Sequence, residues 1–296
     1  MVCAMDRHSF APTGWNGWSA RVALLLAALL LAGCATGLVR DTIPSPSERL
    51  ATAAQIANEA GMEGAVLALR PFSIQSYTRG SGEAITIYIE GDGLAWLSSR
   101  RPSDDPTPIN PLALRLAAAD PAPAVAYLAR PCQYVASDTA CGRRYWTNAR
   151  FAEEVVAAMD EAVDRAKDEA DASKVHLVGF SGGGAVAALV TARREDVASL
   201  RTVAGYLDHV RLNEERGVSP LSGSLDPMEI AGSLGQVPQL HFSGGQDEVI
   251  PVWVAERFVE AQPSEGCARQ VTAPALGHQQ GWLASWPRLL TEPLPC

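Results

Sequence analysis

The chain has 296 residues, of which 47% are hydrophobic and 19% are charged, and its formal net charge is −9. This composition excludes a disordered or fibrous protein and is sufficient for one large core. The moderate acid surplus, with no basic cluster, argues against a nucleic-acid partner. We therefore expect one globular domain that binds no nucleic acid.

The first feature in chain order is an apolar run near the N-terminus. Arg21 precedes about ten apolar residues, which end in the sequence LAGC at 31–34. The run is too short to span a bilayer comfortably, and its basic start and small-residue end are those of a signal peptide. We expect residues 1–33 to be removed. This removal takes away Arg7, Arg21 and Asp6, which leaves 22 basic and 32 acidic residues, a mature charge of −10.

The end of this signal resembles the lipobox of bacterial lipoproteins. There the Cys thiol is diacylated, the preceding peptide bond is cut and the new amine is acylated. The resemblance implies that Cys34 is lipidated and that the mature protein is held on a membrane by its acyl chains without crossing it. Ala35, rather than Asp, implies delivery to the outer membrane of a Gram-negative bacterium. An ordinary signal peptide that contains a Cys is the alternative.

Four further cysteines fit an exported protein: Cys132, Cys141, Cys267 and Cys296. In an oxidising compartment they predict two disulfides, and the simplest of three pairings joins Cys132 to Cys141 and Cys267 to Cys296. A metal site is the alternative, but no CxxC or His-x-x-His spacing accompanies these cysteines. We expect no metal and no cofactor.

Residues 34–46 contain two prolines and several polar residues, which predict a tether. We expect the folded domain over 47–296, with Ser47 capping a first helix that stops at Gly61. Strands are expected at 64–69, 72–79, 83–93, 122–129, 174–180, 199–207, 236–244 and 269–276, and helices at 110–120, 151–170, after Ser181 and at 252–261. This alternation predicts an α/β fold with a mostly parallel sheet covered on both faces.

The sequence GFSGG at 179–183 joins an expected strand to an Ala-rich helix. It fits the G-x-S-x-G nucleophile elbow, in which glycines let strand and helix pack closely around a strained serine. A phosphate-binding loop would need a Lys that is missing here. Ser181 is therefore the candidate nucleophile, and a purely structural serine is the alternative.

This arrangement resembles the α/β-hydrolases, whose chain order is nucleophile, acid, histidine. Downstream, LHFSGGQDEVIP at 240–251 is similar to the family's acid turn, and APALGHQQGW at 273–282 ends a strand with the last histidine of the chain. The resemblance implies a triad of Ser181, Asp247 and His278. Asp208, at the end of the preceding strand, is an alternative acid. The short segment between Gly205 and Asp247 leaves room for at most a small cap.

Acyl transfer also needs donors for an oxyanion. One is the backbone N–H of Gly182, and the second is expected in YIEGDGLAW at 88–96, where the family often shows His-Gly. Here Glu90-Gly91-Asp92-Gly93 leaves Asp92 and Gly93 as alternative donors.

The sequence thus predicts a membrane-anchored serine hydrolase of small-molecule or polymer-end acyl substrates, esters in the first place. Aromatic residues in loops, namely Trp96, Tyr145 and Trp146, are candidates to line its site. Thioesterases, peptidases and acyltransferases share the same machinery. An inactive α/β-hydrolase-fold lipoprotein that serves as a binding module is the alternative from another class. The oligomeric state stays open.

Overall fold

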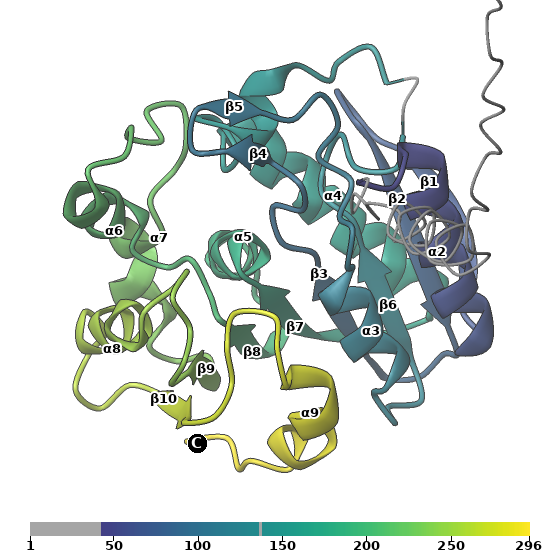
Figure 1. The fold of residues 1–296 in the computed structure, drawn as a ribbon. Helices are drawn as coiled ribbons and strands as arrows, with labels where there is room; N and C mark the ends of the chain where they lie inside the picture. Colours follow the sequence, from purple (N-terminus) through teal and green to yellow (C-terminus); the bar gives the residue numbers. More distant parts are fainter. Residues whose placement is uncertain (1–42, 136–137) are drawn as a thin grey trace, which may run out of the picture. The chain divides into compact units, whose positions relative to one another are not determined.

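The structure is a computed structural model that describes residues 43–135 and 138–296 (Figure 1). The expected signal peptide at 1–33, the expected lipidation site Cys34 and most of the expected tether lie outside these residues. Within the described ranges, no helix is both long and apolar enough to cross a membrane.

The first described helix is α2 (Pro46–Glu59), and its cap is Ser45. The Ser45 hydroxyl accepts a hydrogen bond from the N–H of Glu48, whose carboxylate accepts from the Ser45 N–H at 2.7 Å. Pro46 occupies the first helical position, where its missing N–H has no helical partner to lose. The expectation that Ser47 caps this helix was wrong, because a capping box needs its Glu three residues after the cap.

The centre of the molecule is a sheet of eight strands in the order β1-β2-β6-β3-β7-β8-β9-β10. The strands are β1 (Glu63–Ala68), β2 (Ser73–Arg79), β3 (Ala84–Ile89), β6 (Val125–Leu128), β7 (Lys174–Phe180), β8 (Val197–Val203), β9 (Gln239–Gly244) and β10 (Ala268–Ala273). β2 pairs antiparallel with β1 and β6, and all the other neighbours pair in parallel. The expected mostly parallel sheet is confirmed.

Helices cover both faces of this sheet (Figure 1). One face carries α4 (Glu153–Glu169), α5 (Gly182–Thr191) and α8 (Val252–Glu260), and the other carries α2, α3 (Leu112–Ala118) and α9 (Trp282–Leu290). The remaining elements are the hairpin β4 (Trp96–Ser98) and β5 (Arg101–Pro102), the short helices α6 (His209–Arg216) and α7 (Pro227–Ile230), and the 3₁₀ turns η1 (Arg143–Trp146) and η2 (Ala231–Leu234).

The two faces explain the sequence pattern of the central strands. On β3, Ile85, Ile87 and Ile89 pack in the core below α4 and α5, whereas Tyr88 packs against α9. The Tyr88 hydroxyl accepts a hydrogen bond from Trp286 Nε1 at 3.0 Å. Because both faces of such a strand are buried, its sequence reads as a nearly continuous apolar run.

Both expected disulfides are present. Cys132 pairs with Cys141 and Cys267 with Cys296, at Cα–Cα distances of 5.4 and 5.5 Å. The first follows β6, and the second joins the start of β10 to the C-terminus.

Candidate active site

Ser181 lies between the end of β7 and the start of α5, with φ 50° and ψ −119°. This left-handed backbone is unfavourable for a residue with a side chain. The flanking glycines make it possible: a Cβ on Gly179 would lie 2.3 Å from the Gly183 carbonyl oxygen, and a Cβ on Gly183 would lie 2.3 Å from that of Ile89. Strand, turn and helix therefore pack more closely than they could with any other residue type at positions 179 and 183.

Three residues from three different loops meet at this turn. Ser181 Oγ lies 3.1 Å from His278 Nε2, and His278 Nδ1 lies 2.9 Å from Asp247 Oδ2. The carboxylate is buried and the histidine is largely buried. Because Asp247 can only accept, this contact favours the tautomer with the proton on Nδ1, which leaves Nε2 free to accept from Ser181.

The acid loop uses both oxygens of Asp247. Oδ1 accepts from the N–H groups of Val249 and Ile250 at 2.7 and 2.8 Å, which leaves Oδ2 for His278. A Cβ on Gly244 would lie 2.4 Å from the carbonyl oxygen of Leu276, in the histidine loop. Glycine at this position therefore lets the acid loop and the histidine loop touch.

The histidine loop is held from below by α9. Trp282 is fully buried, and its Nε1 donates to the carbonyl oxygens of Gly277 and His278 at 2.8 and 3.1 Å. The Phe180 ring lies 5.2 Å from the imidazole, measured between centroids. The ring of His278 is thus fixed by packing and by its own backbone.

The alternative acid, Asp208, is engaged elsewhere. Its Oδ1 accepts from the N–H of Arg211 and caps α6, and its Oδ2 pairs with Arg257 Nε at 2.8 Å. Asp208 has no hydrogen bond to His278 among the described residues. The geometry therefore favours Asp247 as the partner of the histidine.

The other described histidines lie outside this contact. His176 and His241 bond to hydroxyls of neighbouring strand residues, and His209 Nε2 lies 3.0 Å from the Leu225 carbonyl oxygen. Burial lowers the pKa of His241 to about 3, so this ring is a neutral core residue.

Two backbone donors lie beside Ser181. Gly182 is the first residue of α5, so its N–H has no partner within the helix. A Cβ on Gly182 would lie 2.2 Å from Asp92 Oδ1, which places residues 92 and 182 in contact. Within residues 43–135 and 138–296, neither the Asp92 N–H nor the Gly182 N–H donates to a protein acceptor. Gly93 packs against Pro106 instead and does not line the cavity that Ser181 and Asp92 share.

The carboxylate of Asp92 is neutralised by two arginines. Arg150 Nη1 pairs with one oxygen, and Arg130 Nη1 lies 3.5 Å from the other. Burial lowers the pKa of Arg130 to about 10, although the neighbouring Asp92 acts in the opposite direction. The two guanidinium groups offset a negative charge that would otherwise repel an oxyanion at Gly182. Neither arginine was predicted, because they lie 38 and 58 residues from Asp92 and belong to no motif.

Ser181 and Asp92 line a cavity of about 500 Å³. Its apolar lining comes from Trp96, Pro102, Tyr206, Leu212, Val218, Pro220, Leu221, Val249 and Ile250. Three arginines also line it, namely Arg143, Arg150 and Arg216. One wall is built by α6 and residues 218–221, so the segment between β8 and β9 forms a small cap, as expected. Trp96 lines the cavity, whereas Tyr145 and Trp146 do not.

Comparisons with known proteins find similar folds among solved structures. No protein-family model matches the sequence, and no curated protein is significantly similar to it. Among solved structures, Est1E from Butyrivibrio proteoclasticus aligns with 77% of this chain and 97% of its own, at 13% identity and a TM-score of 0.54. A membrane phospholipase A described as a bacterial virulence factor aligns with 91% of this chain and 98% of its own, at 19% identity and a TM-score of 0.55.

A third similar structure is an α/β serine hydrolase homologue from Coxiella burnetii. It aligns with 77% of this chain and 95% of its own, at 18% identity and a TM-score of 0.52. The chain therefore has the α/β-hydrolase fold, as its sequence motifs predict.

Proposed function

We propose that the protein is a serine hydrolase that cleaves carboxylic esters through Ser181, His278 and Asp247. The observation that supports this most strongly is the continuous hydrogen-bond relay from Ser181 Oγ through the imidazole to Asp247, at 3.1 and 2.9 Å. It lies at the wall of a largely apolar cavity, next to two backbone donors without protein acceptors.

In this mechanism, Ser181 Oγ attacks the ester carbonyl carbon while its proton moves to His278 Nε2. Asp247 stabilises the imidazolium that forms, and the N–H groups of Gly182 and Asp92 bind the oxyanion. The imidazolium then gives its proton to the leaving alcohol, which leaves an acyl-enzyme. Water, deprotonated by the same imidazole, attacks the acyl group and restores the serine.

The cavity suits an ester with an apolar acyl or alcohol group of modest size, because most of its lining surface is apolar. We also propose that a lipid on Cys34 anchors the mature protein at the outer membrane of a Gram-negative bacterium. An enzyme on a membrane meets lipid-borne esters, and one similar structure is a membrane phospholipase A. Phospholipids therefore belong in the substrate panel beside soluble esters.

The test is the steady-state hydrolysis of p-nitrophenyl esters of increasing acyl length. Ser181→Ala and His278→Ala should each lower kcat/KM at least about a thousandfold, because members of one catalytic unit fail together. Asp247→Asn should cost less, but still about a hundredfold or more.

Asp208→Asn is the matched control, since Asp208 is also a buried acid that follows a strand of the sheet. It should change kcat/KM little even where it lowers stability. Near wild-type activity in Ser181→Ala would remove the hydrolase proposal and favour a binding module, and a reversed order of the two Asp variants would move the acid to Asp208.

A further inference from the structure

The loop that presents Asp92 is held by a second loop, residues 130–134, which follows β6. β6 is the parallel neighbour of β3, so the two loops leave the same edge of the sheet side by side. Besides the ion pair between Arg130 and Asp92, Gln133 links the two loops, and its side chain is almost completely buried. Gln133 Nε2 donates to the Gly91 carbonyl oxygen at 2.9 Å, and its Oε1 accepts from the Arg130 N–H at 3.0 Å.

The Gly91 carbonyl and the Asp92 N–H belong to one peptide unit. In a trans peptide these two groups point in opposite directions, because the six atoms of the unit lie close to a plane. A hydrogen bond that fixes the carbonyl on Gln133 therefore fixes the N–H on the far side, away from Gln133. That N–H has no acceptor among the described residues, and residue 92 touches Gly182.

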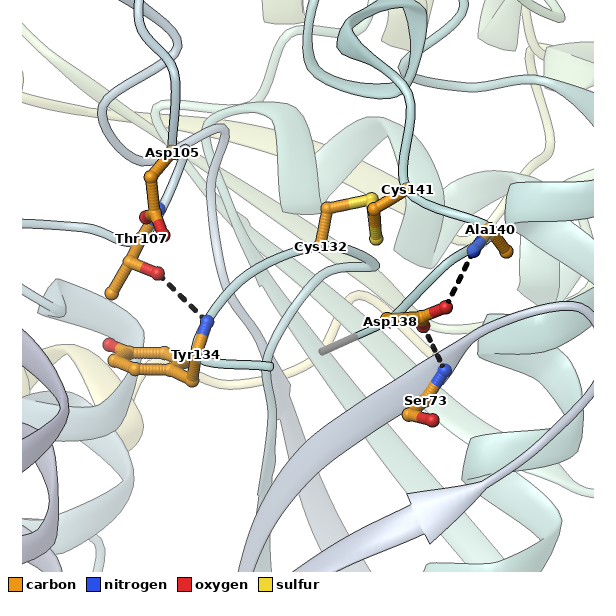
Figure 2. Close-up of a disulfide and its surroundings, with 8 residues drawn as sticks. All are labelled: Ser73, Asp105, Thr107, Cys132, Tyr134, Asp138, Ala140 and Cys141. Carbon is orange, nitrogen blue, oxygen red and sulfur yellow. Dashed lines mark hydrogen bonds between the residues drawn. A yellow bond between two sulfur atoms is a disulfide. The ribbon is translucent and has the colours of Figure 1, made fainter. Parts of the chain in front are cut away.

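The turn that carries Gln133 is itself held in an unfavourable conformation. Cys132 and Tyr134, on either side of it, have φ of 73° and 66°. Each such residue costs about 1 kcal/mol or more, so the turn needs external support. Figure 2 shows the supports: the Cys132–Cys141 disulfide on one side, and the Tyr134 N–H donating to Thr107 Oγ1 at 2.8 Å on the other.

The far end of the disulfide loop is anchored as well. Asp138 Oδ2 accepts from the N–H of Ser73, on β2, at 2.6 Å, and its Oδ1 accepts from the Ala140 N–H at 3.0 Å (Figure 2). Cys141 is thereby fixed against the sheet.

We propose that Gln133, supported by the Cys132–Cys141 disulfide, is a positioning residue that orients the Asp92 N–H as the second oxyanion donor. The inference rests on the proposed hydrolase function and deepens it. It favours Asp92 over Gly93, because the peptide unit that Gln133 fixes carries the Asp92 N–H, and it gives the disulfide a role in turnover as well as in stability. Gln133 acts through the 91–92 peptide and does not touch the substrate.

The first test replaces Gln133 by leucine, which keeps the volume and removes both hydrogen bonds. Loss of an oxyanion donor costs about 10²–10³ in kcat, and a misdirected donor should cost at least about tenfold, with KM changed less than about twofold. Gln239→Leu is the matched control. Gln239 is also a buried glutamine, and its Nε2 donates to Gln262 and to the Leu234 carbonyl oxygen, at the opposite end of the sheet. It should lower the melting temperature and leave kcat unchanged.

The second test uses the two disulfides and does not alter the glutamine. Cys132→Ala with Cys141→Ala should lower kcat, and Cys267→Ala with Cys296→Ala should not. The Cys267–Cys296 disulfide is the control and closes the longer loop, with a sequence separation of 29 against 9. The chain-entropy model therefore predicts that its removal costs more stability. If kcat falls only in the variant without the Cys132–Cys141 disulfide, which should lose less stability, the loss of kcat reflects positioning and not general destabilisation.

The outcomes distinguish the two proposals. If wild-type turnover does not depend on Ser181, the proposed function fails and this inference fails with it. If turnover depends on Ser181 but Gln133→Leu keeps kcat within about twofold of wild type, or loses no more than Gln239→Leu, the inference alone is overturned. If Gln133→Leu does not fold, equal kcat losses for the two disulfide variants overturn it.

Discussion

Glu90 is a buried acid that the proposed chemistry does not use. It follows β3, and its Oε1 accepts from the N–H groups of Gly91 and Ala113 at 3.0 and 3.4 Å. Its Oε2 has no hydrogen-bond partner among the described residues. Burial raises the pKa of Glu90 to about 7, against a lowering effect of hydrogen bonds to which the amides of Gly91 and Ala113 contribute most.

The raised pKa makes stability depend on pH in a defined direction. The folded state binds the Glu90 proton more tightly than the unfolded chain, in which the pKa is near 4.5. The stabilisation by the bound proton is therefore complete below pH 4.5 and is lost as pH rises through 7. A shift of this size corresponds to about 3 kcal/mol in the free energy of unfolding.

Glu90→Gln should remove this dependence, because a glutamine keeps the accepting oxygen and does not titrate. Urea unfolding at pH 5 and pH 8 gives the free energy of unfolding at each pH. Between pH 5 and pH 8, the free energy of unfolding of the variant should rise by about 2–3 kcal/mol relative to that of wild type. Glu63→Gln, at an exposed carboxylate on β1, is the control and should change little. Parallel pH dependences for wild type and Glu90→Gln would refute the reasoning.

Two further predictions concern single sites. Gly183→Ala should lower the free energy of unfolding, measured with urea, by about 3 kcal/mol or more, because the added Cβ would meet the Ile89 backbone. Gly217→Ala is the control: it has φ 61° and open space around it, and it should lower the free energy of unfolding by about 1 kcal/mol. Cys34→Ser should release the protein from membranes or leave its signal peptide uncleaved. A processed variant that still needs detergent for extraction from membranes would contradict the lipobox prediction.

The parts of the fold that could be predicted have local causes. β7 has the expected bounds of 174–180, because its apolar alternation ends abruptly at the Gly-Phe-Ser-Gly turn. The three triad candidates, which the structure brings within hydrogen-bond distance of one another, could be chosen from the sequence because each lies in a short motif at a strand end. The disulfide pairs followed from proximity along the chain.

The remaining features depend on contacts between distant segments. α9 was not predicted, since Pro287 interrupts a pattern whose buried members, Trp282, Trp286 and Leu289, otherwise have helical spacing. The hydrogen bond that supports the loop of Asp92 was not predicted either. Gln133 lies 42 residues from the Gly91 carbonyl that it fixes, and nothing in the local sequence marks a glutamine as buried. Such pairings are decided by the register of β3 and β6.

The central claim is that Ser181 is a nucleophile activated by His278. Reaction of the full chain with a fluorophosphonate probe, followed by peptide mass mapping, tests it most directly, because only an activated serine reacts quickly. We predict a single adduct on Ser181 in wild type, none in Ser181→Ala, and labelling slowed at least about a hundredfold in His278→Ala. A folded wild-type protein that stays unlabelled, or that is labelled equally fast without His278, would contradict the account.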